Sequence, residues 1–317
     1  MSIRKIIITS LSLIAVFLIY LIPDNNYGLS KAEEHLEYVS EDLKTSPVYL
    51  LNDEGMLTKT AINITKDENE IALKAKELLN ILIVEGSLES RIPSGFKGVI
   101  PSDTEILSVK YTNEVLKVDF SKELLDVPLE NEEKVVEAIV YTLTSIDKVD
   151  KIIIYVEGDI LTKLPKSKKN LPSTLNRSFG INKQYNLKTL KNINHVTVYY
   201  NYKVDNQSYY VPVTKYLNDD REKIEIIIDE LTSHSLYGTN LMSYLNDNTE
   251  LLKTSNEDGI LNLTFNNYIF DDINEQSILE EVIYTICLSV EDNYDVNQVV
   301  FKVGDQEIYK SVLKTIE

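Results

Sequence analysis

The chain has 317 residues, about twice the roughly 150 residues of one domain, and 43% of them are hydrophobic, enough for a large core. Its net charge of −18 argues against a general nucleic-acid binder and against a protein held to anionic lipid by basic patches. The single cysteine, Cys287, excludes an intrachain disulfide and a Cys-rich zinc site, and three widely separated histidines disfavour a His-based metal site.

Residues 1–23 predict a membrane segment. Arg4 and Lys5 precede an apolar run over 6–22, which is short beside the about 20 residues of a typical membrane helix. A cleaved signal peptide is the alternative, but no good small-residue cleavage site follows, and no cysteine is placed for lipid attachment. We expect an uncleaved signal anchor in the cell membrane, with the positive flank in the cytoplasm and the rest of the chain outside it.

Residues 24–45 follow as a polar, acidic stretch with a few interspersed Leu and Val residues. Such a stretch forms either a short helix or an extended tether. In both cases it would hold the folded part of the protein away from the membrane.

The remainder of the chain contains an internal repeat. Five segments recur in the same order with nearly the same spacing: 104–107 with 249–252, 115–120 with 260–265, 124–126 with 269–271, 137–143 with 280–286, and 153–159 with 299–305. Two copies are too few for a solenoid, so each must have its own core. We therefore expect a first domain over 46–162, a linker over 163–192 and a second domain over 193–317.

The first copy predicts alternating strands and helices. Their ranges are strands at 48–51 and 57–64, a helix at 69–84, strands at 105–111 and 115–121, a helix at 132–146 and a strand at 149–157. In the fourth strand Leu116, Val118 and Phe120 alternate with Lys117 and Asp119, which is typical of a sheet with one wet face.

The second copy predicts the same order. Its ranges are strands at 196–202 and 208–213, a helix at 220–233, strands at 249–254 and 259–266, a helix at 274–290 and a strand at 296–303. The expected fold class is α+β: two tandem copies of a small sheet-plus-two-helices domain (β-β-α-β-β-α-β), preceded by one N-terminal membrane helix. The helices are expected on one face of each sheet.

The linker contains a basic run and is otherwise rich in Asn, Pro and Gly. Its lysines are Lys163, Lys166, Lys168 and Lys169. This is the one place in the acidic chain where a phosphate could bind. A solvated loop is the simpler interpretation, because charge runs usually lie on solvated surfaces.

No catalytic motif is present: there is no GxSxG elbow, Walker A loop, GxGxxG after a strand, or HExxH helix. We therefore expect no enzyme activity, no catalytic residue, no cofactor and no metal site. The acidic pairs Asp219-Asp220 and Asp271-Asp272 are predicted at helix starts, where carboxylates favour the helix dipole, and they lack the alternating pattern of a calcium loop. Cys287 lies on the apolar stripe of the last helix and is predicted to be buried.

Two small features recur in both copies. The pairs Tyr141-Thr142 and Tyr284-Thr285 occupy equivalent helical positions. Because Thr is mildly unfavourable in a helix, we expect its hydroxyl to pack against the sheet or to bond to backbone. Gly158 and Gly304 each follow the last strand of their copy and are predicted to lie in turns.

The first copy resembles the GerMN domain. The matching residues are 99–104 (VIPSDT), 115–121 (VLKVDFS), Glu137 with Thr142-Leu143, and 156–158 (VEG). Asp103 stands where the family usually has Gly. The second copy departs further, because it lacks a Pro before Thr249 and has Thr264 where the first copy has Asp119.

The resemblance implies an extracytoplasmic protein of spore formation or germination, in the space between mother cell and forespore. There it would support an envelope-spanning protein assembly, with other envelope proteins as partners and no enzymatic activity. Self-association into a ring is a further possibility, since the domain resembles ring-building motifs. A cell-wall glycan-binding module or hydrolase is an alternative from another class. The net charge predicts partners that are neutral or basic where they meet the protein.

Overall fold

The computed structural model describes residues 44–66, 70–233 and 239–313. Residues from Lys44 onward form one compact unit. The predicted membrane helix over 1–23 and the tether up to residue 43 lie outside the described residues. Within the described part of the chain, no helix is both long enough and apolar enough to cross a membrane.

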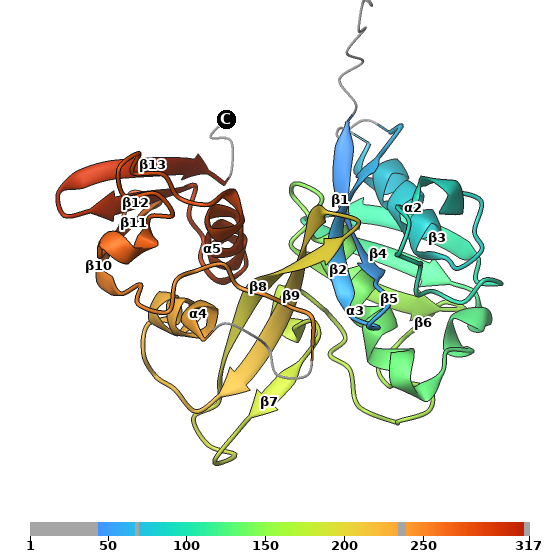
Figure 1. Ribbon diagram of the computed structural model, residues 1–317. Helices are drawn as coiled ribbons and strands as arrows, with labels where there is room; N and C mark the ends of the chain where they lie inside the picture. The colour runs from blue at the N-terminus through green and yellow to red at the C-terminus, as the bar shows by residue number, and fades with distance from the viewer. Residues whose placement is uncertain (1–43, 67–69, 234–238, 314–317) are drawn as a thin grey trace, which may run out of the picture. The chain divides into compact units, whose positions relative to one another are not determined.

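The first domain has the predicted order of elements plus one short strand (Figure 1). They are β1 (Thr45–Leu51), β2 (Leu57–Asn63), α2 (Ile71–Leu82), β3 (Ile106–Thr112), β4 (Val115–Phe120), α3 (Glu132–Leu143), β5 (Lys151–Val156) and β6 (Asp159–Ile160). The added strand is β6, which pairs with the end of β5.

The second domain repeats this order. A short strand, β7 (Gln184–Asn186), precedes it. It comprises β8 (Asn194–Val204), β9 (Gln207–Leu217), α4 (Lys223–Thr232), β10 (Leu251–Glu257), β11 (Ile260–Phe265), α5 (Glu280–Asn293), β12 (Gln298–Val303) and β13 (Gln306–Val312). Here the added strand is β13.

The start of α5 differs from the prediction. The helix was expected from residue 274 but begins at Glu280. The carboxylate of Asp272 instead accepts the N–H groups of Asn274 (2.7 Å) and Glu275 (3.2 Å) in a turn. Both acidic pairs therefore lie in loops before their helices and not in the first helical turn, because a side-chain carboxylate competes with the helix for backbone donors.

Each domain contains one four-stranded sheet, in the order β3-β4-β5-β6 and β10-β11-β12-β13. The central pairs β4–β5 and β11–β12 are parallel, and the outer pairs are antiparallel. The structure aligns Ile152 with Val299, whereas the sequence comparison aligned Ile153 with Val299. The difference arises because one more residue precedes Gly158 than Gly304 in the following turn; both glycines have positive φ, as their predicted turns require.

The first hairpin of each domain does not join that domain's own sheet. β1–β2 and β8–β9 meet in a separate sheet of order β1-β2-β9-β7, with β8 also paired to β9. β2 and β9 touch where Lys59 lies opposite Tyr210. This corrects the expectation of one sheet per domain. Local patterns identify a strand but not its distant partner.

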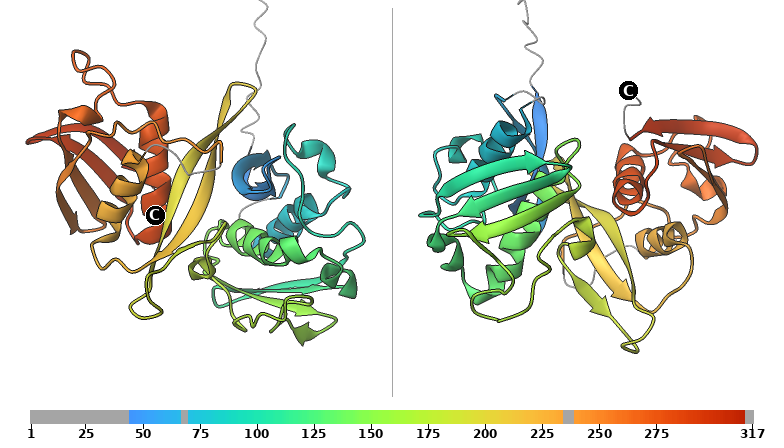
Figure 2. Two further views of the ribbon diagram at one scale, coloured as in Figure 1. Left: turned by 60° about the horizontal axis from the view of Figure 1, so that its bottom comes forward. Right: turned by 180° about the vertical axis from the view of Figure 1, so that it is seen from behind.

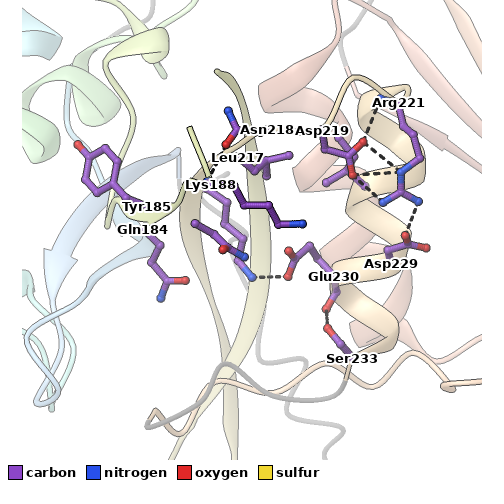
Figure 3. A pocket seen from close by; sticks show the side chains of 13 residues that line it. Gln184, Tyr185, Lys188, Leu217, Asn218, Asp219, Arg221, Asp229, Glu230 and Ser233 are labelled. Carbon is purple, nitrogen blue, oxygen red and sulfur yellow. Dashed lines mark hydrogen bonds and ion pairs between the residues drawn. The ribbon is translucent and has the colours of Figure 1, made fainter. Parts of the chain in front are cut away.

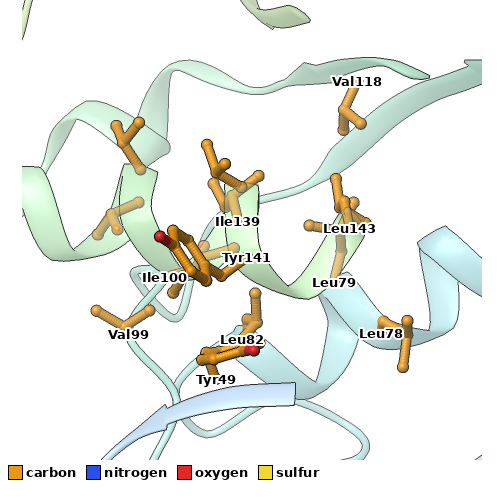
Figure 4. Packing of buried hydrophobic residues seen from close by; sticks show 14 of the residues in the cluster. Tyr49, Leu78, Leu79, Leu82, Val99, Ile100, Val118, Ile139, Tyr141 and Leu143 are labelled. Carbon is orange, nitrogen blue, oxygen red and sulfur yellow. The ribbon is translucent and has the colours of Figure 1, made fainter. Parts of the chain in front are cut away.

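The core of the first domain lies where helices α2 and α3 are enclosed between β1 and the sheet (Figure 4). Leu116, Val118 and Phe120 are fully buried against these helices, which confirms the predicted alternation in β4. The opposite face of this sheet is not covered by a helix (Figure 2, right). Each domain sheet therefore has one buried face and one open face.

The recurrent threonines make the expected backbone bonds. Thr142, fully buried on α3, accepts the N–H of Tyr49 at 3.1 Å and so satisfies the free edge of β1. In the second domain Thr285 donates to the carbonyl of Val282 in its own helix at 3.1 Å. There the equivalent strand-edge contact comes one turn later, where Ser289 accepts the N–H of Tyr199 at 2.9 Å.

Replacing Thr142 should reveal this bond. Thr142→Val keeps the shape but leaves the Tyr49 N–H without an acceptor, so we expect a loss of about 1–3 kcal/mol in unfolding free energy. Thr142→Ser keeps the hydroxyl and loses one methyl group, at a cost of about 1 kcal/mol. Urea unfolding of both variants measures these losses, and a Thr142→Val variant as stable as wild type would disprove the role of the bond.

Glu77 of α2 fixes the chain that leaves β2. Its carboxylate accepts the N–H groups of Thr65 (2.9 Å) and Lys66 (3.0 Å) and pairs with Arg91 at 2.5 Å. Burial raises the pKa of Glu77, but the bonds from Arg91, Thr65 and Lys66 outweigh burial and leave the pKa below its usual value of 4.5. The charged form is therefore the one that stabilises the fold.

This pKa predicts acid sensitivity. The contribution of Glu77 should be fully present above pH of about 4.5 and be lost as pH falls through its lowered folded pKa. Glu77→Gln should flatten that part of the curve of unfolding free energy against pH. Glu89→Gln, at an exposed position of the same domain, is the matched control. Parallel curves for wild type and Glu77→Gln would contradict the assignment.

Candidate interaction site

The described residues do not bring the few chemically reactive side chains together. No group of three or more His, Cys, Asp or Glu in this part of the chain is arranged to hold a metal ion. Cys287 is buried as predicted, and burial raises the pKa of its thiol to about 11. His195 is half-buried beside Tyr216, whereas His35 and His234 lie outside the described residues.

The connecting segment 163–192 packs against the first domain. Four apolar side chains of the segment belong to the core of that domain: Leu164, Leu171, Leu175 and Ile181. Carboxylates of α3 hold the segment by its backbone, since Glu132 accepts the N–H of Ser167 at 2.8 Å and Glu137 accepts that of Asn182 at 2.9 Å. Residues 163–182 are thus a structured part of the first domain, whereas β7 (Gln184–Asn186) pairs with β9 of the second domain.

The basic run lies on this acidic helix. Lys169 forms an ion pair with Glu133 at 3.1 Å, and the N–H of Lys166 bonds to Glu132. The N–H of Lys166 and the ammonium of Lys169 are thus already bonded to carboxylates, which weakens the case for a phosphate site.

Arg177 of the connecting segment joins the two domains. Its guanidinium pairs with Asp292 of α5 in the second domain. It also donates to the hydroxyls of Thr144 (3.2 Å) and Ser145 (2.8 Å) in the first domain. The ring of Tyr141 lies 4.9 Å below it, within cation–π range.

Two equivalent tyrosines complete the joint. Tyr49 of β1 and Tyr199 of β8 occupy matching positions in the two copies, and their hydroxyl oxygens lie 3.0 Å apart. Tyr199 also donates to Asp292 at 2.9 Å. The two copies therefore contact each other through the same residue of the repeat, as subunits do in an isologous dimer.

The charges of the joint are matched. The side chain of Asp292 is 2% exposed and that of Arg177 is 25% exposed. Burial lowers the pKa of Arg177, but the Asp292 carboxylate raises it well above its usual value, so the guanidinium stays charged. Burial and Asp292 raise the pKa of Tyr199, so its hydroxyl stays protonated and donates. We call Arg177, Asp292, Tyr49, Tyr141 and Tyr199 the interdomain joint.

Sequence reasoning missed the joint. Arg177 is a single basic residue in a loop, and Asp292 is one of 50 acidic residues. The useful signal was the equivalence of Tyr49 and Tyr199, but the repeat was detected only from residues 104 and 249 onward.

A pocket with a volume of about 660 Å³ lies between β7, the end of β9 and α4 (Figure 3). Its size suits a small ligand. Most of its wall charges are already paired, however: Arg221 binds Asp219 at 2.8 Å and Asp229 at 2.5 Å, and Lys215 binds Glu230. With Lys188, the wall carries three basic and three acidic side chains. Asp219 thus serves an ion pair, and the wall has no excess of either sign to attract a charged ligand.

The structure so far defines a protein of two repeated α+β domains, fixed to each other by a buried joint and each with one open sheet face. The family described as "Germane: Sporulation and spore germination" matches residues 47–162 and 197–309. The chain belongs to this family, which confirms the resemblance to GerMN domains.

Known relatives agree with this assignment. Spore germination protein GerM of Bacillus subtilis (strain 168) is 29% identical over 281 residues, covering 87% of this chain and 74% of that protein. The solved tandem GerMN domains of the sporulation protein GerM from Bacillus subtilis match with a TM-score of 0.75 at 28% identity, covering 83% of this chain and 92% of that one. These similarities support a role in spore formation or germination.

Breaking the joint should cost stability. Arg177→Met leaves the Asp292 carboxylate buried without its cation, and we expect a loss of roughly 3–5 kcal/mol in unfolding free energy. Adding Asp292→Asn removes the unpaired charge and should recover part of this loss.

Arg221→Met is the matched control, because its pairs with Asp219 and Asp229 are largely exposed and should contribute at most about 1 kcal/mol. Chemical unfolding of the single and double variants measures the coupling. Strictly additive losses for Arg177 and Asp292 would contradict a coupled joint.

Proposed function

We propose that the protein is a membrane-anchored extracytoplasmic scaffold of spore formation or germination, which holds other envelope proteins in an envelope-spanning assembly. Family membership supports the process, and the apolar run over 6–22 supports the anchor. The scaffold role itself is inferred from the architecture of the two domains.

The observation that carries the proposal is the interdomain joint. Two weak binding surfaces on one chain act together only if both can reach their targets at once, because the second contact then forms at a high effective concentration. Arg177 and Asp292 bond the domains to each other, and β2 and β9 continue one sheet between them. The two open sheet faces are therefore held on one rigid support.

Cross-linking in sporulating cells tests the proposal. The full-length tagged chain should recover envelope proteins, and a chain carrying Arg177→Met with Asp292→Asn should recover at least about tenfold less because avidity is lost. Arg221→Met should recover as much as wild type. The mass of the recovered chain also tests the anchor, since an uncleaved segment gives the full 317 residues.

Recovery of no envelope protein would overturn the scaffold role. Recovery that is equal for the joint variant and wild type would show that the fixed arrangement of the domains is irrelevant to it.

A further inference from the structure

The open face of the first sheet carries an unusual arrangement of lysines. Lys110 of β3 lies directly opposite Lys117 of β4, which lies opposite Ile153 of β5. Residues opposite each other project from the same face of a sheet, and neighbours along a strand alternate. Because Leu116 and Val118 point into the helices, Lys110, Lys117 and Ile153 project from the face that no described helix or strand covers.

Lys110 and Lys117 repel each other. Like charges in directly opposed positions destabilise a sheet. Both side chains are exposed, and neither takes part in an ion pair within the described chain. By contrast Lys151, on the same face, lies 3.2 Å from Asp150. An acidic group bound between Lys110 and Lys117 would relieve their repulsion. The pair therefore favours a partner that supplies a carboxylate.

Apolar side chains surround the lysines. The face also carries Val115, Ile153, Tyr155 and Ile160, which are partly or largely exposed. Lys110, Lys117 and Lys151 are balanced only by Asp119 and by Asp150, which pairs with Lys151, so the face has a positive excess of one charge on a chain whose net charge is −18. Mixed apolar and basic groups suit a folded acidic protein better than a pure polyanion, which would leave the apolar groups without contacts.

A second copy of this chain is a poor occupant. Two chains with a charge of −18 repel each other at long range, which slows and weakens their association. A different protein with a local acidic patch and some apolar surface is not subject to this limit. Charge complementarity therefore selects a heterologous partner.

We propose that this face, defined by Lys110, Lys117, Val115 and Ile153 and named the basic sheet face, docks the acidic surface of another envelope protein. The proposal rests on the proposed scaffold function and identifies where that scaffold binds.

The second domain provides a matched comparison. On its open face Lys302 lies opposite Glu307 of β13, so the charges directly opposed there attract each other. Lys253 lies opposite the neutral Thr264. The face has the same architecture without the opposed lysines. The control substitution is Lys76→Glu, at an exposed position of α2 in the first domain and away from both open sheet faces.

Lys117→Glu separates binding from folding. In the free protein it replaces a repulsive Lys–Lys pair by an attractive Lys–Glu pair, so thermal stability should stay equal or rise. Docking of an acidic partner should nevertheless fall, because the new carboxylate repels it. If Lys117 had only a structural role, a variant of equal or higher stability would not bind the partner less well.

The experiment uses the full chain with a photo-crosslinking benzoylphenylalanine at Ile153, expressed in sporulating cells. Crosslinking should yield a defined partner whose crosslinked segment is rich in Asp and Glu. Lys117→Glu should lower that yield at least about tenfold, whereas Lys76→Glu should leave it within about twofold. The yield from lysed membranes should fall as salt is raised, because exposed charges are screened.

Each other outcome overturns the proposal. Crosslinks only to further copies of this chain would assign the face to self-association, and loss of signal after digestion of cell-wall polymers would assign it to a polyanion. An unchanged yield with Lys117→Glu would show that the lysines do not take part in the contact. If tagged full-length chain still recovers envelope proteins while Ile153 crosslinks none, the scaffold stands and only this face is wrong.

Discussion

The buried carboxylate of Asp292 is the constraint on which the arrangement of the two domains depends. A charge with 2% of its surface exposed must be paired, because an isolated ion in the interior is costly. Its cation, Arg177, comes from the segment that α3 of the first domain holds by its backbone. The ion pair can therefore form only when the connecting segment and both domains are in place together.

Unpaired strand edges explain why the two hairpins meet. Each hairpin has two outer edges, and an exposed edge invites unwanted pairing. Helices close one edge of each: Thr142 accepts from Tyr49 on β1, and Ser289 accepts from Tyr199 on β8. The edges of β2 and β9 remain, and they face each other at Lys59 and Tyr210. Loops at Lys97 and Met242 also bond to β1 and β8, and β7 pairs with the end of β9, so the shared sheet joins the edges that remain.

The periodicity of apolar residues predicted those features of the fold that depend on neighbouring residues. The alternation in β4 gave the correct buried face, and the recurrent threonines correctly indicated backbone bonds. The pairing of β2 with β9 and the bond between Arg177 and Asp292 join residues far apart in sequence, and nothing in a single chain marks such partners. The late start of α5 was missed because the turn at Asp272 competes with the helix for the same backbone donors.

One substitution between the copies shows how far they have diverged. Leu51 and Asn201 are equivalent, since each exchanges two backbone bonds with a later loop, at Lys97 and at Met242. Leu51 is part of the first core, but the amide of Asn201 is 1% exposed and has no hydrogen-bond partner among the described protein groups. Such a group weakens the interior it occupies. The two copies therefore keep this backbone contact while the side chain at its centre has changed from an apolar group to a buried amide.

The net charge of −18 predicted partners that are neutral or basic, whereas the basic sheet face favours a partner with an acidic surface. Total charge governs the long-range approach of a partner, whereas the contact itself is decided within about 10 Å, the distance over which salt screens exposed charges. At that range Lys110 and Lys117 dominate over acids on distant helices. A partner with an acidic patch on a weakly charged body satisfies both conditions, because it is not repelled at a distance and is attracted at the surface.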